Sequence, residues 1–150
     1  MNILQTIWSA LTTPNESLIK FMAMPLIFLD VFIGMLFFTT LLNIETTKKR
    51  KLIYVLVYGS LAILFNFVIP TSYTVFINIF VWPLMIFFIL KTTILKSILS
   101  VVLTMSATSL IEFLFSSILF CLFKIDYNLI MTIPLYRTGM SIGIYFIMFL

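Results

Sequence analysis

The chain has 150 residues, of which 63% are hydrophobic and only 9% are charged, and its 9 Lys and Arg outnumber its 5 Asp and Glu. A soluble domain has roughly a quarter of its residues charged, so this composition excludes an ordinary water-soluble domain and predicts that lipid is the main solvent. Because the sequence holds no histidine, it also excludes a histidine phosphoacceptor, His-ligated zinc or haem, and Cys–His peptidase chemistry within these residues.

The first predicted element is a short amphipathic helix over residues 1–12. One helical stripe of this segment is apolar, and it is formed by Ile3, Leu4, Ile7, Trp8 and Leu11. A helix of this pattern is expected to lie in the membrane interface, with the tryptophan at headgroup depth. Thr13, Pro14 and Glu16 then have the spacing of a capping box, which predicts that the next helix begins near Thr13, with Thr13 as its N-cap.

Residues 13–150 are predicted to form an all-α, polytopic membrane helical bundle. Five apolar segments indicate transmembrane helices at about 21–43, 53–69, 73–90, 97–123 and 138–150. At about 1.5 Å per residue, the first is long enough to cross a hydrocarbon core of about 30 Å. The fifth is too short for a full crossing before Leu150, so we expect the sequence to be an N-terminal piece of a longer protein.

Basic residues cluster between the spans and predict the orientation of the chain. Lys48, Lys49, Arg50 and Lys51 follow the first span, and Lys91 and Lys96 lie between the third and fourth spans. The positive-inside rule places the loops 44–52 and 91–96 in the cytoplasm, and the N-terminus and the loop 124–137 outside. The predicted location is a bacterial cytoplasmic membrane, with multiple spans. Because these cations bias orientation and meet anionic headgroups, we do not predict nucleic-acid binding.

Two acidic residues lie within predicted spans and mark a candidate site. Asp30 is in the first span and Glu112 is in the fourth. An ionised acid within the bilayer is expensive, so each is expected to face the bundle or a water-filled cavity. Ser109 and Ser116 share the helical face of Glu112, while Asn66 and Asn78 are candidate hydrogen-bond partners on the second and third spans. These six residues either bind a ligand and relay a change, or act as polar contacts between helices.

No catalytic residue, metal site or cofactor is predicted. The sequence supplies no glycine-rich phosphate loop and no activated nucleophile, so we expect this chain not to be an enzyme. Cys121, the single cysteine, is expected to be a small buried hydrophobic residue. The loop 124–137 mixes polar and apolar side chains, which suits an apolar peptide or lipid-like ligand but also a simple interfacial connector.

Several segments of the chain resemble a known family. They are Leu4–Glu16, Pro25–Phe28 with Asp30, Leu36–Ile44 with Thr46–Lys49, Ile79–Phe80, Phe87–Lys91, Ile94–Leu99, Leu110–Glu112 and Ile133–Arg137. In this order they resemble the N-terminal membrane sensor region of GHKL-type sensor histidine kinases from Firmicutes, which are relatives of the accessory-gene-regulator quorum-sensing receptors. The resemblance extends over nearly the whole chain.

The resemblance implies a membrane-embedded signal-sensing domain of a two-component system. It would detect an extracellular peptide-like signal, form a homodimer in the full-length context, and pass the signal to a kinase domain that this chain lacks. Two other classes stay open. One is a small membrane transport subunit that binds substrate, and the other is a stand-alone membrane interaction or regulatory protein.

Overall fold

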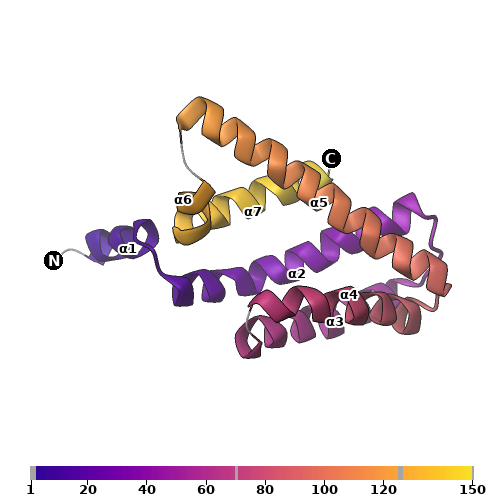
Figure 1. Cartoon of the computed structure of the whole chain (residues 1–150). Coiled ribbons are helices and arrows are strands. Elements are labelled where there is room, and N and C mark those ends of the chain that lie inside the picture. Colours follow the sequence, from indigo (N-terminus) through magenta and orange to yellow (C-terminus); the bar gives the residue numbers. More distant parts are fainter. Residues whose placement is uncertain (1–2, 70, 125–126, 150) are drawn as a thin grey trace.

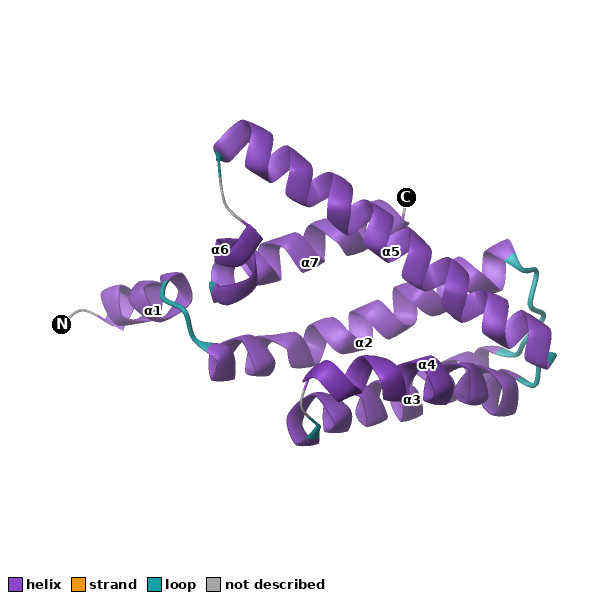
Figure 2. Cartoon of the chain, viewed as in Figure 1, coloured by secondary structure: helices purple, strands orange, loops and turns teal. Residues whose placement is uncertain are grey.

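The computed structural model describes residues 3–69, 71–124 and 127–149, and every element in these ranges is a helix (Figure 1; Figure 2). In chain order the helices are α1 (Ile3–Thr12), α2 (Glu16–Leu41), α3 (Lys48–Val68), α4 (Thr71–Leu90), α5 (Ile94–Phe123), α6 (Tyr127–Thr132) and α7 (Pro134–Phe149). The predicted all-α class is therefore confirmed for these ranges. Outside the described residues lie position 70, the ends of the predicted segments 1–12 and 138–150, and positions 125 and 126 of the predicted loop 124–137.

Polar side chains cap the first turns of three long helices. The side-chain oxygens of Asn15, Thr47 and Thr93 accept hydrogen bonds from backbone N–H groups three residues later in α2, α3 and α5, at 3.0, 3.4 and 3.4 Å. Each bond satisfies one of the N–H groups that the first turn of a helix leaves without a partner inside the helix.

The predicted capping box at Thr13 is wrong. The hydroxyl of Thr13 donates to the carbonyl oxygen of Ser9 at 2.8 Å, and its backbone N–H donates to the same oxygen at 3.0 Å. Thr13 thus closes the end of α1 and does not cap the next helix. Asn15 takes that role, and α2 begins at Glu16.

The basic cluster Lys48–Lys51 is helical, and the predicted loop 44–52 is too wide. These residues form the first turn of α3, and Lys96 likewise lies within α5. Lys and Arg are good helix formers, and the caps at Thr47 and Thr93 start both helices early. The α2–α3 and α4–α5 connections lie at the same end of the bundle (Figure 1), which we call the basic end.

The predicted loop 124–137 contains more helix than expected. It holds α6, and α7 begins at Pro134, before the predicted start of the fifth span at residue 138. Proline suits the first position of a helix, because its ring fixes a helical φ and the missing N–H would have no partner there. Arg137 consequently lies in the first turn of α7.

Helix α2 runs through the middle of the bundle and contacts α3, α5 and α7 (Figure 1). Consecutive long helices run in opposite directions. The main core lies where α2, α3, α4 and α5 meet, and its buried residues are Val31, Met35, Phe38, Ile44, Tyr54, Tyr58, Ile86, Leu90 and Val101. A second cluster, Ile130, Met140 and Ile144, fixes α6 and α7 against α5.

Gly34 allows α2 and α5 to approach closely. A Cβ atom at this position would lie 3.3 Å from the Cγ2 atom of Thr104, which is buried on α5. Small residues let helix backbones come together in this way. Gly34, one helical turn after Asp30, therefore packs against helix α5.

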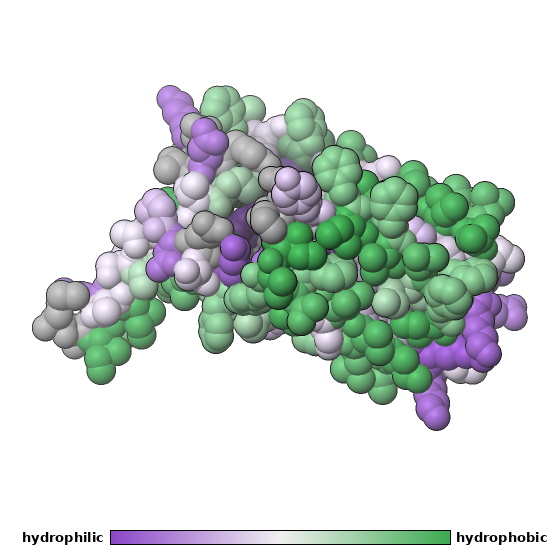
Figure 3. All heavy atoms as spheres, turned by 60° about the horizontal axis from the view of Figure 1, so that its bottom comes forward, coloured by the Kyte–Doolittle hydropathy of each residue, from purple (hydrophilic) through white to green (hydrophobic). Residues whose placement is uncertain are grey.

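The outer surface of the bundle is apolar. Three helices are long and apolar enough to cross a membrane, at Ser17–Leu41, Lys48–Val68 and Ile94–Leu122, and α4 contributes a shorter apolar stretch, Phe76–Leu90. Figure 3 shows a hydrophobic band between two ends where hydrophilic side chains gather. Because exposed apolar surface of this extent suits lipid and not water, the structure supports the predicted membrane-embedded bundle.

Candidate functional site

A cavity of about 760 Å³ lies among the helices, and we call it the bundle cavity. Three predicted site residues line it: Asp30 from α2, Asn66 from α3 and Asn78 from α4. Arg137 and Tyr145 from α7 also face it. The bundle therefore brings polar groups from four helices together around one space.

The bundle cavity extends from one end of the bundle toward its middle. Asn15 and Lys20 line it near the start of α2, and Thr74 does so near the start of α4. Asp30 and Trp82 line it deeper along the same helices. At about 1.5 Å per residue, Asp30 lies about 20 Å along α2 from its first residue. The shallow part is at the end opposite to the basic end (Figure 1).

A smaller pocket of about 180 Å³ lies between α2, α5 and α7, and we call it the charged pocket. Asp30, Glu112 and Arg137 line it, one from each helix. The Nη1 atom of Arg137 lies 3.9 Å from the Oε1 atom of Glu112. This loose ion pair connects α5 to α7, and both side chains remain partly exposed.

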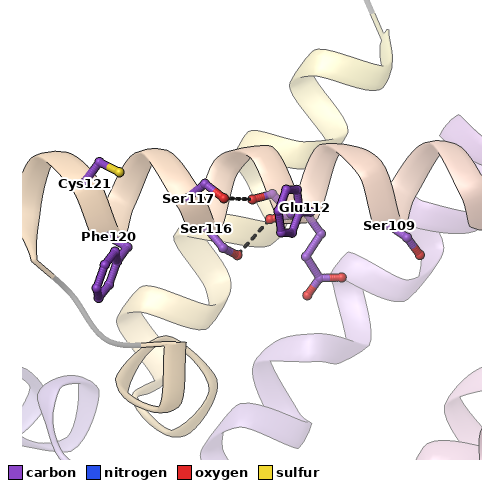
Figure 4. A pocket seen from close by; sticks show the side chains of 7 residues that line it. Ser109, Glu112, Ser116, Ser117, Phe120 and Cys121 are labelled. Atoms are coloured by element: carbon purple, nitrogen blue, oxygen red, sulfur yellow. Dashed lines mark hydrogen bonds between the residues drawn. The ribbon is translucent and has the colours of Figure 1, made fainter.

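Glu112 also borders an open hollow of about 670 Å³ along α5, together with Ser109 and Ser116 (Figure 4). The hydroxyl of Ser116 donates to the carbonyl oxygen of Glu112 at 2.7 Å. Serine and threonine often bond to their own helix in this way, which leaves only the oxygen lone pairs for other partners. Thr108, in contrast, lines the charged pocket. The polar face of α5 is thus divided between two spaces, with Glu112 in both.

Cys121 corrects one expectation. It is exposed and lines the hollow on α5, whereas the sequence predicts a buried residue. The C-terminal part of α5 extends away from α2, α3 and α4 (Figure 1). An apolar segment in lipid does not need protein around it, so position within an apolar run does not predict burial in a membrane protein.

An aromatic stack forms one wall next to the bundle cavity. The ring of Tyr58 stacks between Tyr54 and Trp82, with centroid distances of 5.6 and 5.8 Å. The indole nitrogen of Trp82 donates to the hydroxyl of Tyr54 at 2.7 Å. Offset stacking and this hydrogen bond hold α3 and α4 together. Tyr58 and Trp82 both line the cavity.

Sequence reasoning missed several residues of the site. The sequence analysis places Arg137 in the outer loop 124–137 and does not identify Tyr58, Trp82, Ser141 or Tyr145, although all five residues line the bundle cavity. Pro134 is the sequence signal that could have identified Arg137, because proline favours the first position of a helix. A helix that starts at Pro134 includes Arg137 in its first turn. The aromatic residues carried no signal, because the sequence has many that face lipid.

Among the described residues, no group of three His, Cys, Asp or Glu side chains could hold a metal ion. The candidate site is a set of polar and aromatic side chains around two spaces that share Asp30, Arg137, Ser141 and Tyr145. Comparison with protein-family models, with curated proteins and with solved structures gave no match.

Proposed function

We propose that this chain is the membrane-embedded signal-sensing domain of a two-component sensor histidine kinase. The bundle cavity is the observation that carries the proposal, because it joins Asp30, Asn66 and Asn78 in one space of about 760 Å³. Pockets of about 300–1,000 Å³ with a few convergent polar groups are typical of ligand sites. The resemblance of the sequence to GHKL-type sensors gives this ligand site its proposed role in signalling.

The proposed topology places the mouth of the bundle cavity outside the cell. By the positive-inside rule, the basic end with Lys48–Lys51, Lys91 and Lys96 is cytoplasmic. In this arrangement α2, α3, α4, α5 and α7 are the five spans, and α1 lies in the outer interface with Trp8 exposed to headgroups. A ligand would enter between the start of α2, the start of α4 and α6.

The lining suits a peptide-like signal. The shallow part offers Asn15, Asn66 and Thr132, which can exchange hydrogen bonds with backbone amides, while Ile27, Trp82 and Met105 offer apolar surface further in. A peptide with apolar side chains needs both kinds of contact. The proposed relay is the charged pocket, because a ligand at Asp30 would lie next to the Glu112–Arg137 pair between α5 and α7.

The experiment is to express the full-length product of the gene and to measure its autophosphorylation in proteoliposomes. The probe is the low-molecular-mass peptide fraction of medium conditioned by the source organism, with fresh medium as control. We expect ATP-dependent phosphorylation of a histidine beyond residue 150 that changes with the conditioned fraction. A full-length product without a kinase domain, or phosphorylation that both media leave unchanged, would contradict the proposal.

The same preparation separates the transport alternative. A substrate-binding transport subunit would retain a small nutrient through purification and would not alter phosphate transfer. A sensor domain is instead expected to alter phosphate transfer when the signal is added, without moving the signal into the vesicle lumen.

A further inference from the structure

Two hydrogen-bond acceptors in the bundle cavity lack donors. Within residues 3–69, 71–124 and 127–149, the structure gives the Asp30 carboxylate no hydrogen bond and no ion pair. Over the same ranges, the Oδ1 atom of Asn78 is buried and has no hydrogen-bond partner. Buried polar groups are nearly always paired, and of these two acceptors the Asn78 oxygen is the buried one, whereas Asp30 is half-buried and faces the cavity. Two acceptors without protein donors that line one cavity are groups that a ligand with hydrogen-bond donors would satisfy.

The charge balance around Asp30 favours a positively charged ligand. Arg137, the cation that shares the charged pocket, lies 3.9 Å from Glu112. Lys20, the other cation that lines the bundle cavity, is ten residues before Asp30 on α2, about 15 Å along the helix. When both carboxyl groups are ionised, two acids and one nearby base leave one negative charge without a partner. A charge inside a membrane bundle is expensive unless it is paired.

The surroundings of Asp30 favour an organic cation over a metal ion. Calcium and magnesium need about six oxygen ligands, whereas the lining of the cavity that holds Asp30 includes apolar side chains such as Val31, Trp82 and Met105. Within the described part of the chain, no group of three His, Cys, Asp or Glu side chains could hold a metal ion. Tyr58 and Tyr145 line the same cavity as Asp30. A cavity of about 760 Å³ also has room for an apolar body attached to the charged group.

We infer that the bundle cavity binds a protonated amine carried on an apolar body, with the ammonium group on Asp30 and the Oδ1 atom of Asn78 as a second acceptor along the cavity. An ammonium group donates three hydrogen bonds, and those to a carboxylate are among the stronger ones in proteins. This inference rests on the proposed function, because it assigns a chemical class to the ligand of the proposed receptor cavity.

The test uses Trp82 as a reporter. The chain has 2 tryptophans, so Trp8→Phe leaves Trp82 as the single source of tryptophan fluorescence. The purified chain in lipid nanodiscs is titrated with L-leucinamide, which is cationic, and with N-acetyl-L-leucinamide, which has the same side chain without the charge. Sodium chloride is matched throughout. We expect saturable quenching by the cation, at least tenfold tighter than by its neutral analogue.

Asp30→Asn should remove this discrimination, because it should weaken the binding of leucinamide at least tenfold and leave the binding of the neutral probe unchanged. Glu45→Gln, which removes one negative charge at the exposed α2–α3 connection, should change neither. Equal fluorescence quenching by the two probes, or the same quenching by sodium chloride alone, would overturn the inference. The comparison of the two probes uses the Trp8→Phe protein, so it does not depend on whether an Asp30 variant folds. A cation response without any change in full-length phosphorylation would instead contradict the proposed function alone.

Discussion

The guanidinium of Arg137 lies 3.9 Å from the carboxylate of Glu112 and connects the first turn of α7 to the middle of α5. Asp30 on α2 borders the same charged pocket. Three charged residues that are far apart in the sequence thus meet between three helices. We propose that this junction passes the state of the bundle cavity to α5.

Replacing Glu112 tests the ion pair. Because the two groups are partly exposed and 3.9 Å apart, Glu112→Gln should lower the stability by no more than about 1 kcal/mol while weakening the signalling response of the full-length protein. Thermal unfolding followed by circular dichroism and phosphorylation measure these two effects. In a double-mutant cycle, Glu112→Gln with Arg137→Gln should cost less than the sum of the single changes. Strict additivity would show that the two residues do not interact.

The α5–α7 contact can be tested with two glycines of α7. A Cβ atom at Gly143 would lie 2.8 Å from the Cζ atom of Phe115, whereas a Cβ atom at Gly139 would meet nothing within 4 Å. Both changes to alanine gain the same helix propensity. Gly143→Ala should therefore be less stable than Gly139→Ala by about 1 kcal/mol, because the ring of Phe115 has to move to admit the methyl group, and the two variants are compared by their Tm values. Phe115→Leu should restore part of this loss, and equal Tm values would refute the close contact.

The hydrogen bond between Trp82 and Tyr54 should matter for stability. Trp82→Phe leaves the hydroxyl of Tyr54 buried without this donor, since Tyr54 has an exposed fraction of 0% and accepts at 2.7 Å. A loss of about 1–3 kcal/mol is expected. Tyr54→Phe with Trp82→Phe removes both polar groups, so chemical unfolding should show less loss than the sum of the single variants. A Trp82→Phe variant with unchanged stability would argue against the bond.

The basic cluster should control orientation. In a Cys121→Ser background, single cysteines at Asn15 and Thr92 report on the two ends of the bundle, because both residues lie in connections between helices. In intact spheroplasts a membrane-impermeant maleimide should label the Asn15 variant and not the Thr92 variant. Changing Lys48–Lys51 to Gln should make Thr92 accessible in part of the molecules. An unchanged labelling pattern would show that other features set the topology.

Much of the fold could be predicted from the sequence, because lipid requires long apolar helices with their backbone hydrogen bonds satisfied internally. The predicted spans 21–43, 53–69 and 97–123 overlap α2, α3 and α5 because apolar length alone indicates them. The caps at Asn15, Thr47 and Thr93, which start these helices earlier, were not part of the prediction. The predicted start of α2 near Thr13 is too early, because Thr13 can close one helix or open the next, and local spacing does not decide between them.

The candidate site was less predictable. Asp30 and Glu112 stood out because acids are rare within apolar runs, and Asp30, Asn66 and Asn78 do line one cavity. The role of Arg137 depends on where α7 begins and how it crosses α2 and α5. The crossing angle and the rotation of each helix depend on side-chain packing over the whole interface. The periodicity of apolar residues along one helix does not give this information. Tyr58 and Trp82 were missed for the same reason.

The most direct test of the account is whether water and small reagents reach the bundle cavity from outside the cell. Ala62 lines the cavity on α3, and Ser60 is exposed on the same helix but does not line it. Each is replaced by cysteine in the Cys121→Ser background and treated, in spheroplasts, with a negatively charged, membrane-impermeant methanethiosulfonate. Because such reagents need a hydrated thiolate, we predict that the Ala62→Cys variant reacts at least tenfold faster than the Ser60→Cys variant. Equal protection of both cysteines would contradict a cavity that opens to the outside.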